Sequence, residues 1–136
     1  MDKATFEALK AKVDEDLEIN ENNIQQKSLK LANIYNYYLK LYIQEFGILK
    51  YKTTEKNKKY QQKYHYYKFE NQYQLSSAKE IEIYVNGDEE IHKINLTIQA
   101  QETIVKYLEQ VLTNINNTGY RIKSYIDIEK IKHGLS

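Results

Sequence analysis

The chain contains no cysteine and no proline, and only four of its 136 residues are glycine. Without cysteine it can form no disulfide, no thiolate nucleophile and no sulfur-ligated metal site. Proline breaks helices and glycine weakens them, so their scarcity favours long uninterrupted helices over a turn-rich β fold. A chain of this length is long enough for one domain and short for two. We therefore expect a single, mainly α-helical domain.

Two kinds of apolar segment are also missing. The N-terminal sequence MDKATFEALKAK alternates charge and lacks the apolar stretch of a signal peptide. No apolar run approaches the roughly 18 residues that a membrane-spanning helix needs. The sequence therefore predicts a soluble intracellular protein with no membrane partner.

The residue patterns of a catalytic or metal site are absent as well. The histidines His65, His92 and His133 are far apart and belong to no cluster with metal-ligand spacing. The acidic runs at 14–16 and 88–90 are more typical of solvated faces or helix starts than of a metal site. No glycine-rich loop that could hold phosphates is present. We therefore predict no catalytic residues, no metal and no cofactor, and a protein that is not an enzyme.

Apolar residues recur at helical spacing through the first half of the chain. A short helix is expected over 4–16, followed by an N-cap at Asn20 or Asn22. A long second helix is expected to continue to about residue 68. Its apolar side chains keep a spacing of three and four: Leu31, Ile34, Tyr35, Tyr38, Leu41, Tyr42 and Leu49.

The middle of the chain is expected to link two helical parts. Residues 71–78 show no periodicity and are predicted to form a loop. The next segment, EIEIYV at 80–85, alternates apolar and polar residues, so at most one short strand is expected there. Because a lone strand needs a partner, this segment either pairs with a strand of another subunit or is an extended linker. The single domain is thus divided into 1–70, a linker at 71–87, and 88–136.

The second half carries a heptad-like apolar seam. Asn86 or Asp88 is expected to cap a helix whose seam contains one polar residue, Gln101, and Gly119 is expected to end it before a short terminal helix over 120–133. The seam packs either within the chain or between subunits, and we favour self-association. The residues expected at the subunit contacts are Ile91, Ile94, Ile98, Val105, Leu108, Leu112, Ile115 and Ile122.

Positive charge is concentrated in one short segment. Residues 50–68 contain seven lysines and one acid, Glu55, a local net charge of +6, whereas the whole chain carries only +1. Such a concentration suggests a directed electrostatic contact. On a helix, Lys52, Lys56, Lys59 and Lys63 lie within a stripe about 60° wide, since each residue turns by roughly 100°. Tyr60, Tyr64 and Tyr67 form a second stripe beside it.

Cations beside aromatic rings are what a single nucleic-acid strand needs, because the cations contact phosphates and the rings stack on bases of any sequence. Lysine, a point charge, suits sequence-neutral phosphate contact better than base reading. Tyrosine stripes are also common in helix cores, so from these residues alone core tyrosines with a solvated lysine flank remain an open alternative. A helical adaptor that uses the same stripes for protein contacts, and a duplex-binding architectural protein, are further alternatives.

Four blocks of sequence carry a family resemblance: FEALKAKVDEDLEIN at 6–20, KYHYYKF at 63–69, NGDEEIHKINLTIQAQETIVKYLEQVL at 86–112 and INNTGYRIKSYIDIEKIKHG at 115–134. They resemble, in order, the opening helix, the basic and paired-tyrosine motif that ends the long N-terminal helix, the acidic helix start with its heptad helix, and the closing signature of the UvsY family. This family comprises recombination mediators of T4-like and marine bacteriophages. The likeness covers essentially the whole chain.

The resemblance implies a non-enzymatic, homo-oligomeric ring of hexamer or heptamer size. Such proteins bind single-stranded DNA, help displace the phage single-strand DNA-binding protein and load a RecA-like recombinase, in the cytoplasm of the infected host cell. The family's DNA-contacting basic residue matches Lys63, followed by the pair Tyr66 and Tyr67, and its C-terminal helices drive assembly.

The chain departs from the family pattern at several positions. Lys68 and Phe69 stand where a small residue and glycine are usual, Gln61 stands at a second basic position, and Tyr64 and Ile128 replace tryptophans of marine members. The turn after the long helix is therefore expected to differ, and the DNA contact to depend more on other lysines. The predicted DNA-binding residues are Lys52, Lys56, Lys58, Lys59, Lys63, Tyr64, Tyr66, Tyr67 and Lys68.

Overall fold

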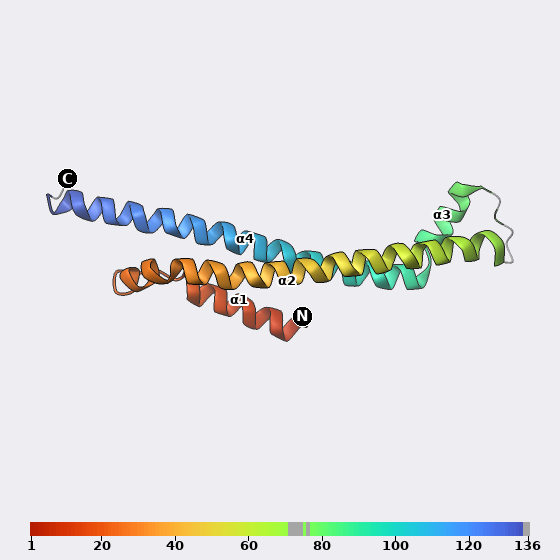
Figure 1. Ribbon diagram of the computed structural model, residues 1–136, viewed down its shortest axis with the longest axis horizontal. Helices are drawn as coiled ribbons and strands as arrows, with labels where there is room; N and C mark the ends of the chain where they lie inside the picture. The colour runs from red at the N-terminus through yellow and green to blue at the C-terminus, as the bar shows by residue number, and fades with distance from the viewer. Residues whose placement is uncertain (71–74, 76, 135–136) are drawn as a thin grey trace. The chain divides into compact units, whose positions relative to one another are not determined.

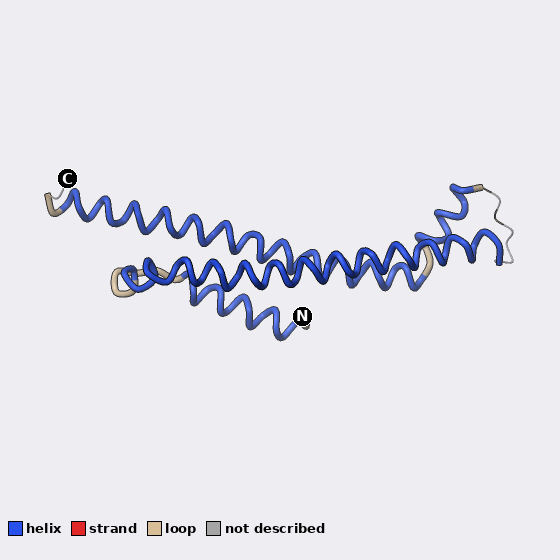
Figure 2. Tube along the Cα trace, viewed as in Figure 1, coloured by secondary structure: helices blue, strands red, loops and turns tan. Residues whose placement is uncertain are grey.

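The computed structural model describes residues 1–70, 75 and 77–134. In chain order these residues form α1 (Lys3–Leu17), α2 (Ile24–His65), the π-helical turn η1 (Tyr66–Glu70), α3 (Ala78–Asn86) and α4 (Glu89–Lys132), as labelled in Figure 1. Figure 2 shows helices and loops but no strand among them. No helix in the described ranges is long and apolar enough to span a membrane. The prediction of a mainly α-helical protein is confirmed.

Short polar side chains explain where the first two helices begin. The Asp2 carboxylate accepts a hydrogen bond from the backbone N–H of Thr5 at 2.7 Å, as an N-cap does. The Asn20 side chain accepts from the N–H groups of Asn22 and Asn23 at 2.9 and 3.1 Å, and this turn leads into α2. The expected helix over 4–16 is therefore confirmed. Asn20 holds the turn that precedes α2 rather than the first helical residue, since α2 begins at Ile24, and α2 continues without interruption to His65.

The strand considered for 80–85 is wrong, because these residues lie in α3. Ser77 caps the helix by accepting from the N–H of Glu80 at 3.1 Å. In a helix, Ile81 and Val85 are four residues apart and share one face, which is buried, whereas Ile83 falls on the exposed side. Helix α3 occupies much of the linker predicted at 71–87, and residues 71–74 and 76 of the predicted loop lie outside the described residues.

The predicted helix end at Gly119 and the separate terminal helix are also wrong. Helix α4 runs through Gly119 to Lys132. A Cβ atom at Gly119 would lie 3.2 Å from Cδ2 of Leu31, so glycine serves close packing here rather than a cap. The positive φ that usually favours glycine at a helix end is found at Gly134, with φ of 70°.

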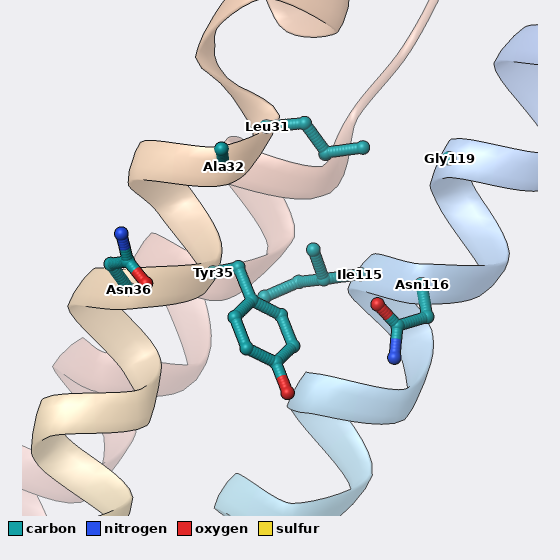
Figure 3. A pocket seen from close by; sticks show the side chains of 7 residues that line it. All are labelled: Leu31, Ala32, Tyr35, Asn36, Ile115, Asn116 and Gly119. Atoms are coloured by element: carbon teal, nitrogen blue, oxygen red, sulfur yellow. The ribbon is translucent and has the colours of Figure 1, made fainter.

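The chain divides into two compact units. The first comprises Met1–Ile43 and Lys106–Ser136. In it α1 packs on the first half of α2: the hydroxyl of the fully buried Tyr38 donates to the Asp16 carboxylate at 2.6 Å. The Lys27 ammonium donates to two carbonyl groups in the last turn of α1, at Glu15 and Asp16. In the same unit, Figure 3 shows side chains of α2 and α4 around a recess lined by Leu31, Ala32, Tyr35, Asn36, Ile115, Asn116 and Gly119.

The second unit comprises Gln44–Val105. Its polar seam residue, Gln101, is buried and donates to the backbone oxygen of Glu45 at 2.8 Å and to the Glu45 carboxylate at 2.6 Å. A small apolar core joins the end of α2, α3 and the start of α4. It consists of Ile81, Val85 and Ile91, with Tyr60, Tyr64, Tyr67 and Leu75 packed against it.

The chain itself covers most of the predicted seam. Ile94 and Leu112 are half-buried. The other six residues predicted at subunit contacts are buried within the single chain: Ile91, Ile98, Val105, Leu108, Ile115 and Ile122. The periodicity therefore located core positions correctly, and the use of these residues between subunits stays a prediction.

Candidate nucleic-acid interface

The lysines of the basic segment fall into two groups. Lys58 and Lys68 are exposed, and among the described residues Lys58 pairs only with the nearby Glu55, at 3.4 Å. Lys52 and Lys56 are half-buried and form no ion pair with any residue that the structure describes. Their ammonium groups are thus available to an external anion.

The remaining two lysines of the predicted stripe are paired with acids at the start of α4. The Lys59 ammonium lies 2.7 Å from Oε2 of Glu90. The Lys63 ammonium lies 3.3 Å from Oδ2 of Asp88 and 3.4 Å from Oε1 of Glu90. The basic residue that matches the family motif is therefore already in contact with two carboxylates of the same chain.

Asp88 is the central group of this contact. Its side chain is only 9% exposed. One carboxylate oxygen, Oδ1, accepts from the backbone N–H groups of Glu90 and Ile91 at the start of α4, which confirms the cap predicted at Asn86 or Asp88. The other, Oδ2, accepts from the Tyr67 hydroxyl at 2.8 Å and pairs with Lys63. One carboxylate thus starts a helix and holds two residues of the family motif.

The pKa values of these groups shift in the directions that stabilise the charged pairs. Burial alone would raise the pKa of Asp88, but the Tyr67 hydroxyl, the Glu90 N–H and Lys63 outweigh it and lower that pKa. Burial would lower the pKa of Lys63, but its two carboxylate partners raise it. The hydrogen bond to Asp88 raises the pKa of Tyr67 to about 12. All these groups therefore keep their usual protonation states at neutral pH.

The aromatic side chains also divide into packed and exposed rings. Tyr64 and Tyr67 are half-buried against the small core of the second unit, which is the packing role that the sequence left open. Tyr66 is 42% exposed and lies edge-on to the Tyr67 ring, with centroids 5.1 Å apart. Lys63 approaches the Tyr66 ring at 5.8 Å. Only part of the predicted tyrosine set is thus free to stack on a base.

An open recess of about 500 Å³ lies along the last turns of α2 and η1. Its walls combine aromatic rings with an amide and a cation, and the His65 and Phe69 rings are 4.9 Å apart. This chemistry suits stacked bases and a nearby phosphate. The lining residues are Tyr60, Gln61, Tyr64, His65, Lys68 and Phe69.

Several residues of this surface were not predicted from the sequence. Gln61, His65 and Phe69 were not counted among the DNA-binding candidates, although their spacing of four places them on one helix face. Asp88 and Glu90 were interpreted as part of a solvated face or a helix start, in preference to a metal site. Their charge complements that of the basic segment, and this complementarity was the available signal. At no place in the described part of the chain do three His, Asp or Glu side chains gather as a metal site would need.

The chain matches a known protein family over most of its length. Residues 12–135 match the family model described as recombination, repair and ssDNA binding protein UvsY. The chain belongs to the UvsY family. The resemblance inferred from the sequence is therefore confirmed, and the description of the family names recombination, repair and single-stranded DNA binding.

Solved structures agree on the fold of this family member. Three crystal structures of the bacteriophage T4 recombination mediator protein UvsY are similar to it, each with a TM-score of 0.83. The structure in lattice type IV shares 16% sequence identity with this chain, and the match covers 93% of this chain and 98% of the T4 chain. Lattice types II and I share 15% and 14%, covering 93% and 92% of this chain and 96% and 98% of the other. No curated protein sequence matches the chain.

Proposed function

We propose that this UvsY-family protein is a phage recombination mediator that binds single-stranded DNA, helps displace the phage single-strand DNA-binding protein and loads a RecA-like recombinase. Family membership supports the recombination and DNA-binding role. The observation that carries the assignment to a surface is the concentration of cations and rings at the end of α2 and in η1, where exposed lysines adjoin an aromatic recess. No ATP-binding motif is needed, because ATP hydrolysis belongs to the recombinase.

The strand is expected to follow this face with its phosphates on lysines and its bases on rings. Lys58 and Lys68 are exposed, and Lys52 and Lys56 have no acid partner among the described residues, so these four can contact phosphates without disturbing the fold. Bases would stack on the exposed Tyr66 and on the rings of the recess. Such contacts tolerate any base sequence, as a mediator that loads a recombinase on arbitrary DNA requires.

Assembly into a homo-oligomeric ring of six or seven subunits in the infected host cytoplasm belongs to the same proposal. Several DNA faces in one ring would bind one strand together, and every contact after the first is effectively intramolecular. Since the chain buries most of the predicted seam, the apolar side chains accessible for self-association are those exposed on α4. They include Leu96, Tyr120, Ile128 and Ile131.

The test is fluorescence anisotropy of a labelled oligo-dT across a salt series, beside a duplex competitor. Lys56, Lys58 and Lys68 are replaced together by alanine, because none of them pairs with α4 and the substitution leaves its start intact. Single strands release roughly 0.7 counterion per phosphate contact, so losing three contacts should make the log–log salt slope shallower by about 2. We expect binding that prefers single strands and weakens strongly in the variant.

The control removes three exposed lysines of the other unit, Lys3, Lys40 and Lys123, and so changes the net charge equally. It should bind nearly as tightly as the parent chain, with both variants keeping the parent mass in light scattering. Equal weakening of the two variants would mean that net charge alone attracts DNA. Weak binding by all three proteins would instead favour the helical adaptor, in which these tyrosines serve only packing.

A further inference from the structure

The contact between α2 and the start of α4 has an unusual feature for a surface ion pair: two lysines converge on one carboxylate. Lys59 and Lys63 are four residues apart and therefore project from the same face of α2. Their ammonium groups lie 2.7 Å from Oε2 and 3.4 Å from Oε1 of Glu90, one on each oxygen. The two cations thus already hold a single anionic group between them.

We propose that Lys59 and Lys63 form a two-lysine phosphate site for single-stranded DNA, and that Glu90 is its resident anion, which a DNA phosphate displaces. A phosphate diester, like a carboxylate, offers two anionic oxygens that accept hydrogen bonds from ammonium groups. It can therefore take the place of Glu90 without any change in the lysines. This inference rests on the proposed single-stranded DNA binding and adds to it an internal competitor for two of the cations.

The two acids of the contact differ in a way that identifies which one leaves. The Asp88 side chain is 9% exposed, caps α4 and accepts from Tyr67, so its release would disrupt the helix start. The Glu90 side chain is 53% exposed, and its ion pairs within the described residues are those with the two lysines. Glu90 can rotate into water at little cost, whereas Asp88 stays and positions Lys63.

The energetics favour exchange of Glu90 for a DNA phosphate over a permanent contact between Glu90 and the two lysines. Exposed ion pairs are weak in water and are screened by salt. A strand held by several lysines gains each further phosphate contact at high effective concentration, so it can displace a single exposed carboxylate. Glu90 then lowers the affinity of one subunit for stray phosphate while leaving a strand bound at many points.

Oligo-dT binding by the Glu90→Gln variant tests the proposal, with Glu89→Gln as the matched control. Glu89 is exposed in the same turn of α4, its replacement changes the charge equally, and it forms no ion pair with any described residue. Removing the competitor should tighten binding about two- to five-fold per engaged subunit relative to Glu89→Gln, the range that an exposed ion pair is worth. Circular dichroism and light scattering check that helicity and mass are unchanged.

The salt series supplies a readout that a merely structural role would not move. In the parent chain, the displaced Glu90 carboxylate takes up cations from the solution, and this uptake offsets part of the counterion release from DNA. Glu90→Gln removes that uptake, so it should steepen the log–log salt slope of binding by up to about 0.7. In a Lys59→Ala background the gain from Glu90→Gln should largely disappear, since the strongest cation partner is gone.

Equal affinity of Glu90→Gln and Glu89→Gln, or weaker binding by Glu90→Gln, would overturn the phosphate site while leaving DNA binding by the other lysines intact. Failure of the parent chain to bind oligo-dT at all would overturn the proposed function itself, and the inference with it.

Discussion

Each compact unit contains a tyrosine hydroxyl bound to an aspartate that also pairs with a lysine, but the two aspartates stand at opposite ends of their helices. In the first unit Asp16 lies in the last turn of α1, with Lys12 at 2.9 Å and Tyr38 at 2.6 Å. The negative end of the helix dipole disfavours a carboxylate there. Asp16 therefore depends on its side-chain partners, and the trio fastens α1 to α2.

In the second unit Asp88 precedes α4, where the helix dipole and two backbone N–H groups favour a carboxylate. Its partners Lys63 and Tyr67 come from the basic segment, and Glu90 adds a second acid to the same lysine. An aspartate, a lysine and a tyrosine thus fasten two helices together in the first unit. In the second unit the same three kinds of side chain hold residues of the family motif beside the candidate nucleic-acid interface. The difference lies in the position of the acid on its helix, and not in the burial of the ion pair, since Asp88 is 9% exposed and Asp16 is 23% exposed.

The largest expected contrast is between Tyr38→Phe and Tyr67→Phe. Tyr38 is fully buried, and its hydroxyl binds a charged group, so its loss should lower the free energy of unfolding by about 1.5–3 kcal/mol. Tyr67 is half-buried, and after its loss Asp88 keeps Lys63 and two backbone N–H groups as partners, so about 0.5–1.5 kcal/mol is expected. Urea unfolding at one fixed protein concentration measures both. Equal losses of unfolding free energy would show that the two trios stabilise the chain to the same extent.

Acid should weaken both trios. The pKa values of Asp16 and Asp88 are lowered in the folded chain: burial opposes the shift, but the tyrosine hydroxyls and lysines outweigh it. The unfolded state therefore binds more protons near pH 4, and the stability that these groups contribute is present above that pH and is lost as the pH falls further. Urea midpoints measured from pH 6 to pH 3 should fall.

Replacement of one aspartate at a time distinguishes the two units in that acid titration. Asp16→Asn and Asp88→Asn should each flatten the fall, because asparagine does not titrate, and asparagine at 88 still caps α4. An acid profile that neither substitution changes would assign the pH dependence to other carboxylates.

The smallest expected contrast concerns one glycine in each unit. A Cβ at Gly47 in α2 would meet nothing within 4 Å, so Gly47→Ala should stabilise the chain by about 0.5–1 kcal/mol through helix propensity and a less flexible unfolded state. At Gly119 the same change meets Leu31 at 3.2 Å and should gain less or destabilise. Thermal unfolding of the two variants measures the difference. A larger gain in stability from Gly119→Ala than from Gly47→Ala would mean that the Leu31 side chain moves aside at no cost.

Several features followed from the sequence because they depend on local periodicity and composition. The scarcity of glycine and proline predicted the helical class, and steps of three and four predicted the buried positions Ile91, Leu108 and Ile115. The family resemblance also came from sequence blocks alone. The basic segment is read directly from residue type, and its role as a DNA-binding surface stays a prediction.

Only the tertiary structure decided what such patterns serve. The alternation at 80–85 fits a strand and a helix alike, and the apolar face offered by Tyr60 and Tyr64 selects the helix. From the sequence, Gly119 predicts a helix end, whereas in the structure it lies inside α4 and leaves room for the Leu31 side chain. The state of Lys63 depends on Asp88, which is distant in sequence and is brought close by packing. Periodicity is a property of neighbours along the chain, whereas a contact between distant side chains exists only after the helices pack.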